Sequence, residues 1–231
     1  MLTAILIDGA FFLKRFPRIY ARHDPMDPVV VAKTMHKMAC NHLHDKKGSA
    51  SHDLYRIFFY DCPPITKKAH YPISKKSVDF SKTPMAKFRL ALHEEIKKLR
   101  KVALRLGHLS DISEWKYKTE TLDALRQGTL QPADLTDNHF VYEGRQKGVD
   151  MRIGLDIASI AYKKLADQIV LVAGDSDFVP AAKLARREGI DFILDPMWNQ
   201  ISESLLEHID GLRSTSPNPN KRAGLSAAPP V

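Results

Sequence analysis

Short aliphatic runs that end at an aspartate recur along the chain. The first, at 3–7, is followed by Asp8 and Gly9, and we expect a buried strand that breaks there into a loop. Continuous apolar runs of this length are typical of strands covered on both faces, as in parallel sheets. Further strands are predicted at 53–62, around Trp115 and Tyr117 within 108–118, at 139–144, at 168–177 and at 190–195.

Segments in which apolar residues have helical spacing separate these strands. The clearest is 84–106, which Thr83 would cap and Gly107 would end. Asp27 predicts the N-cap of another helix, at 28–43. The other predicted helices cover 150–166, 178–188 and 201–212, with a short helix and a loop within 119–136, and a polar loop is predicted at 63–83.

Strands that alternate with helices of this length predict an α/β fold with a central, mostly parallel sheet and right-handed crossovers. The chain has 231 residues, enough for one such domain. We place the domain at 1–213, with an insertion or elaborated crossover at about 63–138. Because the stretch 214–231 is rich in Ser, Pro, Asn and Ala, a disordered tail is expected there.

The net charge of the chain indicates an anionic partner. The formal net charge is +8, which favours a partner such as nucleic acid. Basic residues are dense within 67–105, and a second group consists of Lys14, Arg15, Arg18 and Arg22. The alternative interpretation is a solvated helix face beside a flexible loop.

Membrane, disulfide and zinc functions receive no support from the sequence. No apolar run approaches the roughly 18 residues that a membrane span requires, and the N-terminus lacks a basic region with a cleavage site. We therefore expect no membrane partner and a cytoplasmic location. Cys40 and Cys62 show no CxxC or Cys/His spacing, so neither a disulfide framework nor a zinc site is predicted.

Acidic side chains gather at the predicted strand ends: Asp8, Asp61, Asp175 and Asp177 all stand there. In open parallel sheets, these ends share the edge at which ligands bind. Asp150, at the start of a predicted helix, would enter from the same edge. Converging carboxylates raise one another's pKa, and a hard divalent cation such as Mg²⁺ or Mn²⁺ relieves that conflict. Beside basic flanks, such a site suits phosphodiester hydrolysis.

Four motifs, in the order ILIDGAFF, KGVDMRIGLDIA, VLVAGDSDFVPAAKLARREGI and SESLLEHIDGL, resemble the NYN domain of the PIN-like nuclease superfamily, in its bacterial LabA-like branch. The resemblance spans about 3–212, and its KGVD and GDSDF blocks are specific. It implies a PIN-like three-layer α/β/α fold with a basic, partly helical insertion, and a metal-dependent ribonuclease that uses Mg²⁺ or Mn²⁺. Its acidic centre would consist of Asp8, Asp150, Asp175 and Asp177.

Several of these residues have a second interpretation. Asp150 and Asp177 could serve only as helix caps. Asp156 lies six residues after Asp150, which turns the two side chains about 120° apart on a helix. The family pattern includes an aspartate at this position, so Asp156 is kept as a further candidate metal ligand. The candidate substrate contacts are Lys14, Arg15, Arg145 and Lys147, and for Lys147 a solvated loop lysine is the alternative.

The chain departs from the family pattern after its first aspartate. Many members have an asparagine two or three residues later, where this chain has Ala10, Phe11 and Phe12. A non-catalytic RNA-binding or regulatory NYN module is therefore the alternative function. RNA is the expected partner in either case, and a homodimer is left open. An aspartyl-phosphate phosphatase is set aside, because it needs an aspartate where Ala10 stands.

Overall fold

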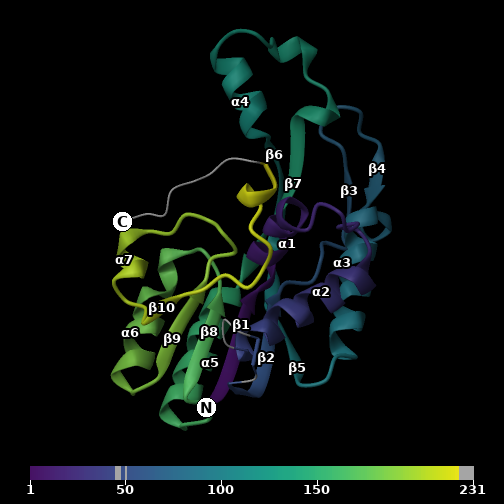
Figure 1. Ribbon diagram of the computed structural model, residues 1–231. Coiled ribbons are helices and arrows are strands. Elements are labelled where there is room, and N and C mark those ends of the chain that lie inside the picture. The colour runs from purple at the N-terminus through teal and green to yellow at the C-terminus, as the bar shows by residue number, and fades with distance from the viewer. Residues whose placement is uncertain (45–47, 50, 224–231) are drawn as a thin grey trace.

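The computed structural model describes residues 1–231 except 45–47, 50 and 224–231 (Figure 1). The side chains of residues 110–112, 145, 146, 222 and 223 also lie outside the description. Within the described ranges, no helix combines the length and the apolar character that crossing a bilayer requires.

A six-stranded parallel sheet forms the centre of the fold, in the order β10–β9–β8–β1–β2–β5. The predicted α/β fold with a central parallel sheet is confirmed, and its layers are those of a PIN-like three-layer fold. The strands are β1 (Leu2–Asp8), β2 (Asp53–Asp61), β5 (Val102–Leu106), β8 (Gln168–Val172), β9 (Asp191–Asp195) and β10 (Gly211–Leu212).

Helices cover both faces of this sheet (Figure 1). Along β1, Ala4 and Leu6 point into the core beneath α5 and α6, whereas Ile5 and Ile7 point into the core beneath α1, α2 and α3. Burial on both faces explains why positions 4–7 of the strand are all apolar. The helices are α1 (Gly9–Ile19), α2 (Pro28–Cys40) and α3 (Pro84–Lys97) on one face, and α5 (Val149–Tyr162) and α6 (Val179–Arg187) on the other.

The helix predicted at 84–106 is too long. α3 ends at Lys97, and after a turn in which Lys101 has a φ of 59° the chain enters β5, which pairs with β2. Gly107 ends this strand and not a helix, and its backbone nitrogen donates to the carbonyl oxygen of Asp61 at 2.8 Å. Pairing with the open edge of β2 supplies hydrogen bonds that the local sequence pattern does not reveal.

Helices and strands are found where loops were predicted after β1 and β2. α1 begins directly after Asp8, which accepts hydrogen bonds from its first backbone N–H groups. Within the loop predicted at 63–83, β3 (Lys68–His70) and β4 (Ser77–Asp79) pair in a small antiparallel hairpin. A short polar segment can form such a hairpin although it lacks the apolar pattern from which strands are predicted.

The carboxyl-terminal part also differs from expectation. The helix predicted at 201–212 is reduced to α7 (Glu203–Leu206), and the chain then adds β10 to the sheet edge. The start of the expected disordered tail packs against α2: Thr215 Oγ1 donates to the carbonyl oxygen of Met38 at 2.8 Å, and Ser216 is buried. Residues 224–231 of that predicted tail lie outside the described residues.

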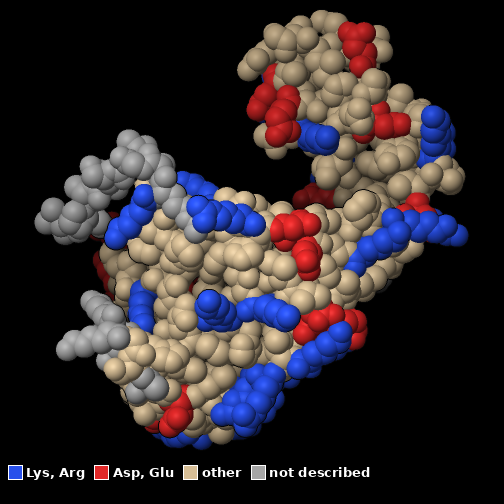
Figure 2. Space-filling model, turned by 45° about the vertical axis from the view of Figure 1, so that its right-hand side comes forward, with Lys and Arg blue, Asp and Glu red and all other residues tan. Residues whose placement is uncertain are grey.

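An arm projects from the body beyond the carboxyl edge of the sheet (Figure 1). It consists of β6 (His108–Tyr117), α4 (Thr119–Arg126) and β7 (Phe140–Lys147), with β6 and β7 paired antiparallel. Stacked rings of Phe80 and Tyr142, with centroids 4.5 Å apart, pack the arm against the segment before α3. Figure 2 shows a hollow between the tip of the arm and the body, whose surface on this face carries many Lys and Arg side chains.

Candidate functional site: an acidic pocket at the carboxyl edge of the sheet

A pocket of about 460 Å³ lies at the carboxyl edge of the sheet. β1 and β8 are neighbours in the sheet, so the loops that follow them meet there. The loop and helix after β1 supply Asp8, Ala10, Phe11 and Lys14, the loop after β8 supplies Gly174, Asp175 and Ser176, and the segment after β9 supplies Asn199 and Ser202. We call this site the acidic pocket.

Asp8 is both the last residue of β1 and the N-cap of α1. Its Oδ1 accepts hydrogen bonds from the backbone nitrogens of Ala10 (3.0 Å) and Phe11 (3.1 Å). Burial raises the pKa of Asp8 from its ordinary value of 3.8 to about 6, and the charges of Asp150 and Asp61 contribute to the rise. The two backbone hydrogen bonds lower this pKa but do not offset the burial.

Asp150, in the first turn of α5, is close enough to the other aspartates to interact with them. Its pKa is raised, first by partial burial and then by the charges of Asp175 and Asp177. Because Asp150 in turn raises the pKa of Asp8, the four carboxylates expected to be catalytic interact electrostatically. They come from three distant parts of the chain: Asp8 and Asp175 line the acidic pocket, whereas Asp150 and Asp177 do not.

The structure does not support the capping interpretation of Asp150 and Asp177. Gly148, with a φ of 78°, is the N-cap of α5, and Phe178 is the N-cap of α6. Neither aspartate therefore caps a helix. Asp175 does have a capping role, because its Oδ1 accepts from the backbone nitrogen of Asp177 at 3.0 Å and so begins the 3₁₀ turn Ser176–Phe178.

Two further aspartates are occupied by partners outside the acidic pocket. Asp156 accepts a hydrogen bond from the hydroxyl of Tyr60 at 2.8 Å and lies 3.3 Å from Nε of Arg105. The helix turns Asp156 away from Asp150, and a role for Asp156 as a metal ligand stays a prediction. Asp61 is buried, pairs with Arg89, and lies 2.7 Å from Nε2 of His93.

Of the basic residues expected to contact the substrate, some line the acidic pocket and others do not. Lys14 lines the acidic pocket and is exposed. Arg15 is not available to a substrate in this way, because its Nε and Nη2 donate to the carbonyl oxygen of Met197 at 3.2 and 2.8 Å. Lys147 is exposed at the end of β7 and does not line the pocket. The side chain of Arg145 lies outside the described residues.

Asn199 and Ser202 line the acidic pocket, although the motifs gave no reason to select them. Asn199 follows a turn in which Met197 and Trp198 have φ values of 46° and 62°. Non-glycine residues adopt this left-handed region at a cost, and they persist in it where the surroundings hold them. The usable signal was the position of this segment after β9, since ligands bind at strand ends in such sheets.

The donor chemistry of the pocket suits a hard divalent cation. Among the described residues, no three His, Cys, Asp or Glu side chains stand close enough to hold a metal ion together. Mg²⁺, however, is usually bound by one or two carboxylates, several waters and substrate phosphates. Asp8 and Asp175 offer only oxygen. Burial first, and then the charges of other carboxylates, raise the pKa of Asp8, and a bound cation would favour its ionised form.

Comparison with known proteins places these features in a family. Residues 77–212, more than half of the chain, match the family model of the NYN domain. The matched region begins at β4, so β1 and Asp8 lie before it. A solved structure of a protein of unknown function from Vibrio parahaemolyticus RIMD 2210633 is 15% identical, with 91% of this chain and 90% of that chain covered and a TM-score of 0.45. No curated protein matches the sequence. The predicted NYN resemblance is confirmed, whereas the LabA-like branch stays a prediction. The chain belongs to the NYN domain family.

Proposed function

We propose that this protein is a metal-dependent ribonuclease that hydrolyses RNA phosphodiester bonds in the acidic pocket with Mg²⁺ or Mn²⁺. The observation that carries the proposal is that Asp8 and Asp175, from distant parts of the chain, line one pocket at the carboxyl edge of the sheet. The negative charge of Asp150 also acts on Asp8. Membership of the NYN family supports a nuclease. The net charge of +8 supports a polyanionic substrate.

Asp8 and Asp175 would hold the cation, because both line the pocket. When bound, a divalent cation supplies Lewis-acid polarisation of a phosphoryl oxygen and activation of a water molecule. Oδ1 of Asp8 accepts hydrogen bonds from the first turn of α1. Its Oδ2 has no hydrogen-bond partner among the described residues. The carboxylate is therefore oriented by its own helix and keeps one oxygen for a ligand.

Lys14 and Asn199 would position the RNA. Lys14 places a positive charge on the wall of the acidic pocket, where a phosphate oxygen can bind. Asn199 provides an amide that both donates and accepts hydrogen bonds. The asparagine that many family members have shortly after the first aspartate is absent from this chain, and Asn199 brings the same functional group to the pocket from another segment.

The alternative is an RNA-binding or regulatory module without turnover. It is favoured by the side chains that face the pocket just after Asp8, since Ala10 and Phe11 offer no polar group there. Such a module would bind RNA with a strong dependence on salt and would leave the RNA intact.

RNA cleavage in the presence of Mn²⁺ distinguishes the two functions. We expect the wild type to cleave, and Asp8→Asn and Asp175→Asn to lose at least about a hundredfold in rate. Asp134→Asn is the matched control, because it removes the same charge from an exposed position in the arm. Salt-dependent RNA binding without cleavage by the wild type would favour the module, and equal cleavage by all variants would reveal a contaminating nuclease.

A further inference from the structure

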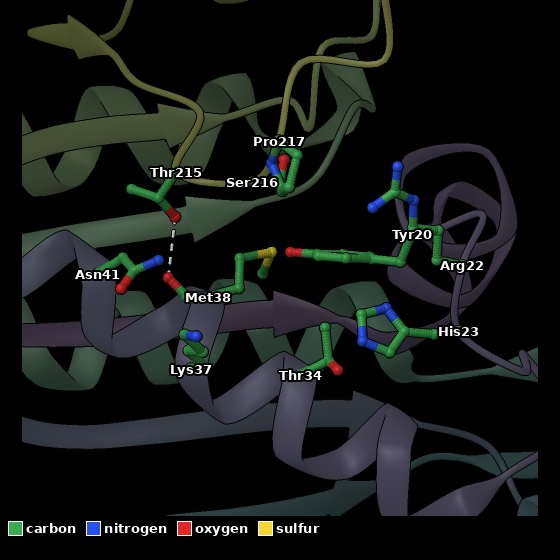
Figure 3. Close-up of a pocket in the computed structure, with 10 residues that line it drawn as sticks. All are labelled: Tyr20, Arg22, His23, Thr34, Lys37, Met38, Asn41, Thr215, Ser216 and Pro217. Atoms are coloured by element: carbon green, nitrogen blue, oxygen red, sulfur yellow. Dashed lines mark hydrogen bonds between the residues drawn. The ribbon is translucent and has the colours of Figure 1, made fainter. Parts of the chain in front are cut away.

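A second pocket, of about 440 Å³, lies beyond the other end of α1 (Figure 3). The turn after α1, helix α2 and the segment 215–217 form its walls. Thr215 joins two of these walls, since its hydroxyl donates to the carbonyl oxygen of Met38 at 2.8 Å. We call this site the basic pocket, for the charges described next.

The lining of the basic pocket is suited to an anion. Arg22 and Lys37 both line it and are exposed, and no Asp or Glu among the described residues does so. In the described part of the chain neither cation takes part in an ion pair. Asn41 and Thr34 add neutral hydrogen-bonding groups to the same walls. Figure 3 shows Arg22 on one side of the ring of Tyr20, and Lys37 and Asn41 on the other.

Two unpaired cations match a phosphate monoester better than a phosphodiester. A monoester carries a charge of about −1.5 to −2 at neutral pH, because its second pKa is near 6. An internal phosphodiester carries a single charge. In a nucleic acid, the monoester occurs only at the end of a strand.

A line of basic residues along α1 connects the basic pocket with the acidic pocket. Lys14 lines the acidic pocket and Arg22 lines the basic pocket, and Arg18 lies between them in sequence. Residues four apart share one side of a helix, so Lys14 and Arg18 point the same way. All three are exposed, and within the described ranges none has an ion-pair partner.

The length of α1 sets the distance between the two pockets. Its 11 residues span about 16 Å at roughly 1.5 Å per residue. A strand of several nucleotides is needed to span such a distance.

We propose that the basic pocket binds the terminal phosphate monoester of an RNA strand, whose backbone follows Lys14, Arg18 and Arg22 into the acidic pocket. The choice of RNA rests on the proposed ribonuclease function. The inference adds a substrate class to it: strands with a phosphorylated end, cut several nucleotides from that end.

Binding in the presence of a chelator tests the proposal without requiring cleavage. Three RNAs of one sequence are compared, with a 5′-phosphate, with a 3′-phosphate, or with hydroxyl groups at both ends. We expect the wild type to bind one phosphorylated RNA at least about fivefold more tightly than the hydroxyl form. Arg22→Ala/Lys37→Ala should abolish this ratio, and Lys33→Ala/Lys163→Ala, which removes two exposed lysines outside the pocket, should keep it.

Equal affinity of the wild type for all three RNAs would overturn the proposal, and so would an unchanged ratio in Arg22→Ala/Lys37→Ala. A mononucleotide that binds as tightly as the phosphorylated RNA would also overturn it, because the line of basic residues would then contribute nothing. Since no cleavage is measured, loss of the end preference leaves the ribonuclease proposal standing. A protein that prefers the phosphorylated end but never cleaves would refute only the ribonuclease proposal.

Discussion

Arg15 and Met197, 182 residues apart, are joined by two hydrogen bonds from the guanidinium group to the carbonyl oxygen. Arg15 follows Lys14 on α1, and Met197 begins the left-handed turn that leads to Asn199. The pair therefore links the two walls of the acidic pocket that carry its basic and its amide side chain.

Replacing Arg15 should disturb the pocket as well as the fold. Arg15→Ala removes both donors from the Met197 carbonyl, and we expect a loss of about 1–3 kcal/mol in the free energy of unfolding. The turn at Met197 and Trp198 would relax from its left-handed conformation, so Asn199 would move and KM for RNA should rise. Urea unfolding and steady-state cleavage measure the two effects. Arg15→Lys should behave almost like Arg15→Ala, because lysine lacks the planar pair of donors.

A methyl group at Gly174 should deform the acidic pocket. A Cβ at this position would lie 2.6 Å from the ring of Phe11, which lines the same pocket. We expect Gly174→Ala to lose about 1–3 kcal/mol of stability and most of its cleavage rate. Phe11→Leu in the same chain should restore part of the stability, because it removes the clashing ring.

Gly154→Ala is the control for that experiment. A Cβ at Gly154, within α5, meets nothing within 4 Å. Alanine is favoured over glycine in a helix by up to about 1 kcal/mol, so this variant should be slightly more stable than the wild type and equally active. Equal thermal unfolding of Gly174→Ala and the wild type would contradict the close contact with Phe11.

The raised pKa of Asp8 predicts how the stability of the metal-free protein depends on pH. The folded protein holds this proton up to a pKa of about 6, whereas the ordinary value is 3.8. The folded state therefore binds more protons than the unfolded state between these values, and the stability should fall as the pH rises from about 4 to 6. The contribution is at most about 3 kcal/mol. Asp8→Asn should remove this fall, so that the variant is more stable than the wild type at pH 7.5 and little different at pH 4.

A bound divalent cation should offset the repulsion between the carboxylates and so stabilise the folded protein. At about 100 times its dissociation constant, Mn²⁺ should stabilise the wild type by about 2.7 kcal/mol. The gain should disappear in Asp8→Asn/Asp175→Asn and persist in Asp134→Asn. Because protons compete with the metal for Asp8, the affinity for Mn²⁺ should decline below about pH 6. Thermal unfolding with and without Mn²⁺ measures each of these effects, and equal stabilisation of all variants would place the ion elsewhere.

The strand-end rule predicted where the carboxylates lie, because the order of strands and helices is local information. Asp8 and Asp175 follow apolar runs that could only be buried strands, and β1 and β8 are indeed neighbours. The boundary between α3 and β5 could not be predicted in the same way. Leu99, Ala103 and Leu106 have helical spacing, whereas Val102, Leu104 and Leu106 alternate as in a strand. Pairing with β2 decides between the two patterns.

For Asn199 the sequence indicates only a place after a strand end, for a related reason. Its position depends on the contact between Arg15 and Met197, which no local pattern encodes. Asp156 shows the opposite case, because the resemblance to the family favoured a ligand where helix geometry opposed one. The contacts with Tyr60 and Arg105 agree with the helix geometry.

The arm leaves and rejoins the body at one point, because His108 at the start of β6 pairs with Lys147 at the end of β7. The two ends of the arm are neighbours, so the residues between them do not need to bridge a gap in the central fold. The arm can therefore be exchanged, lengthened or shortened as a cassette while β5 and α5 keep their places. An insertion or deletion between His108 and Lys147 would leave Asp8 and Asp175 in place at the acidic pocket.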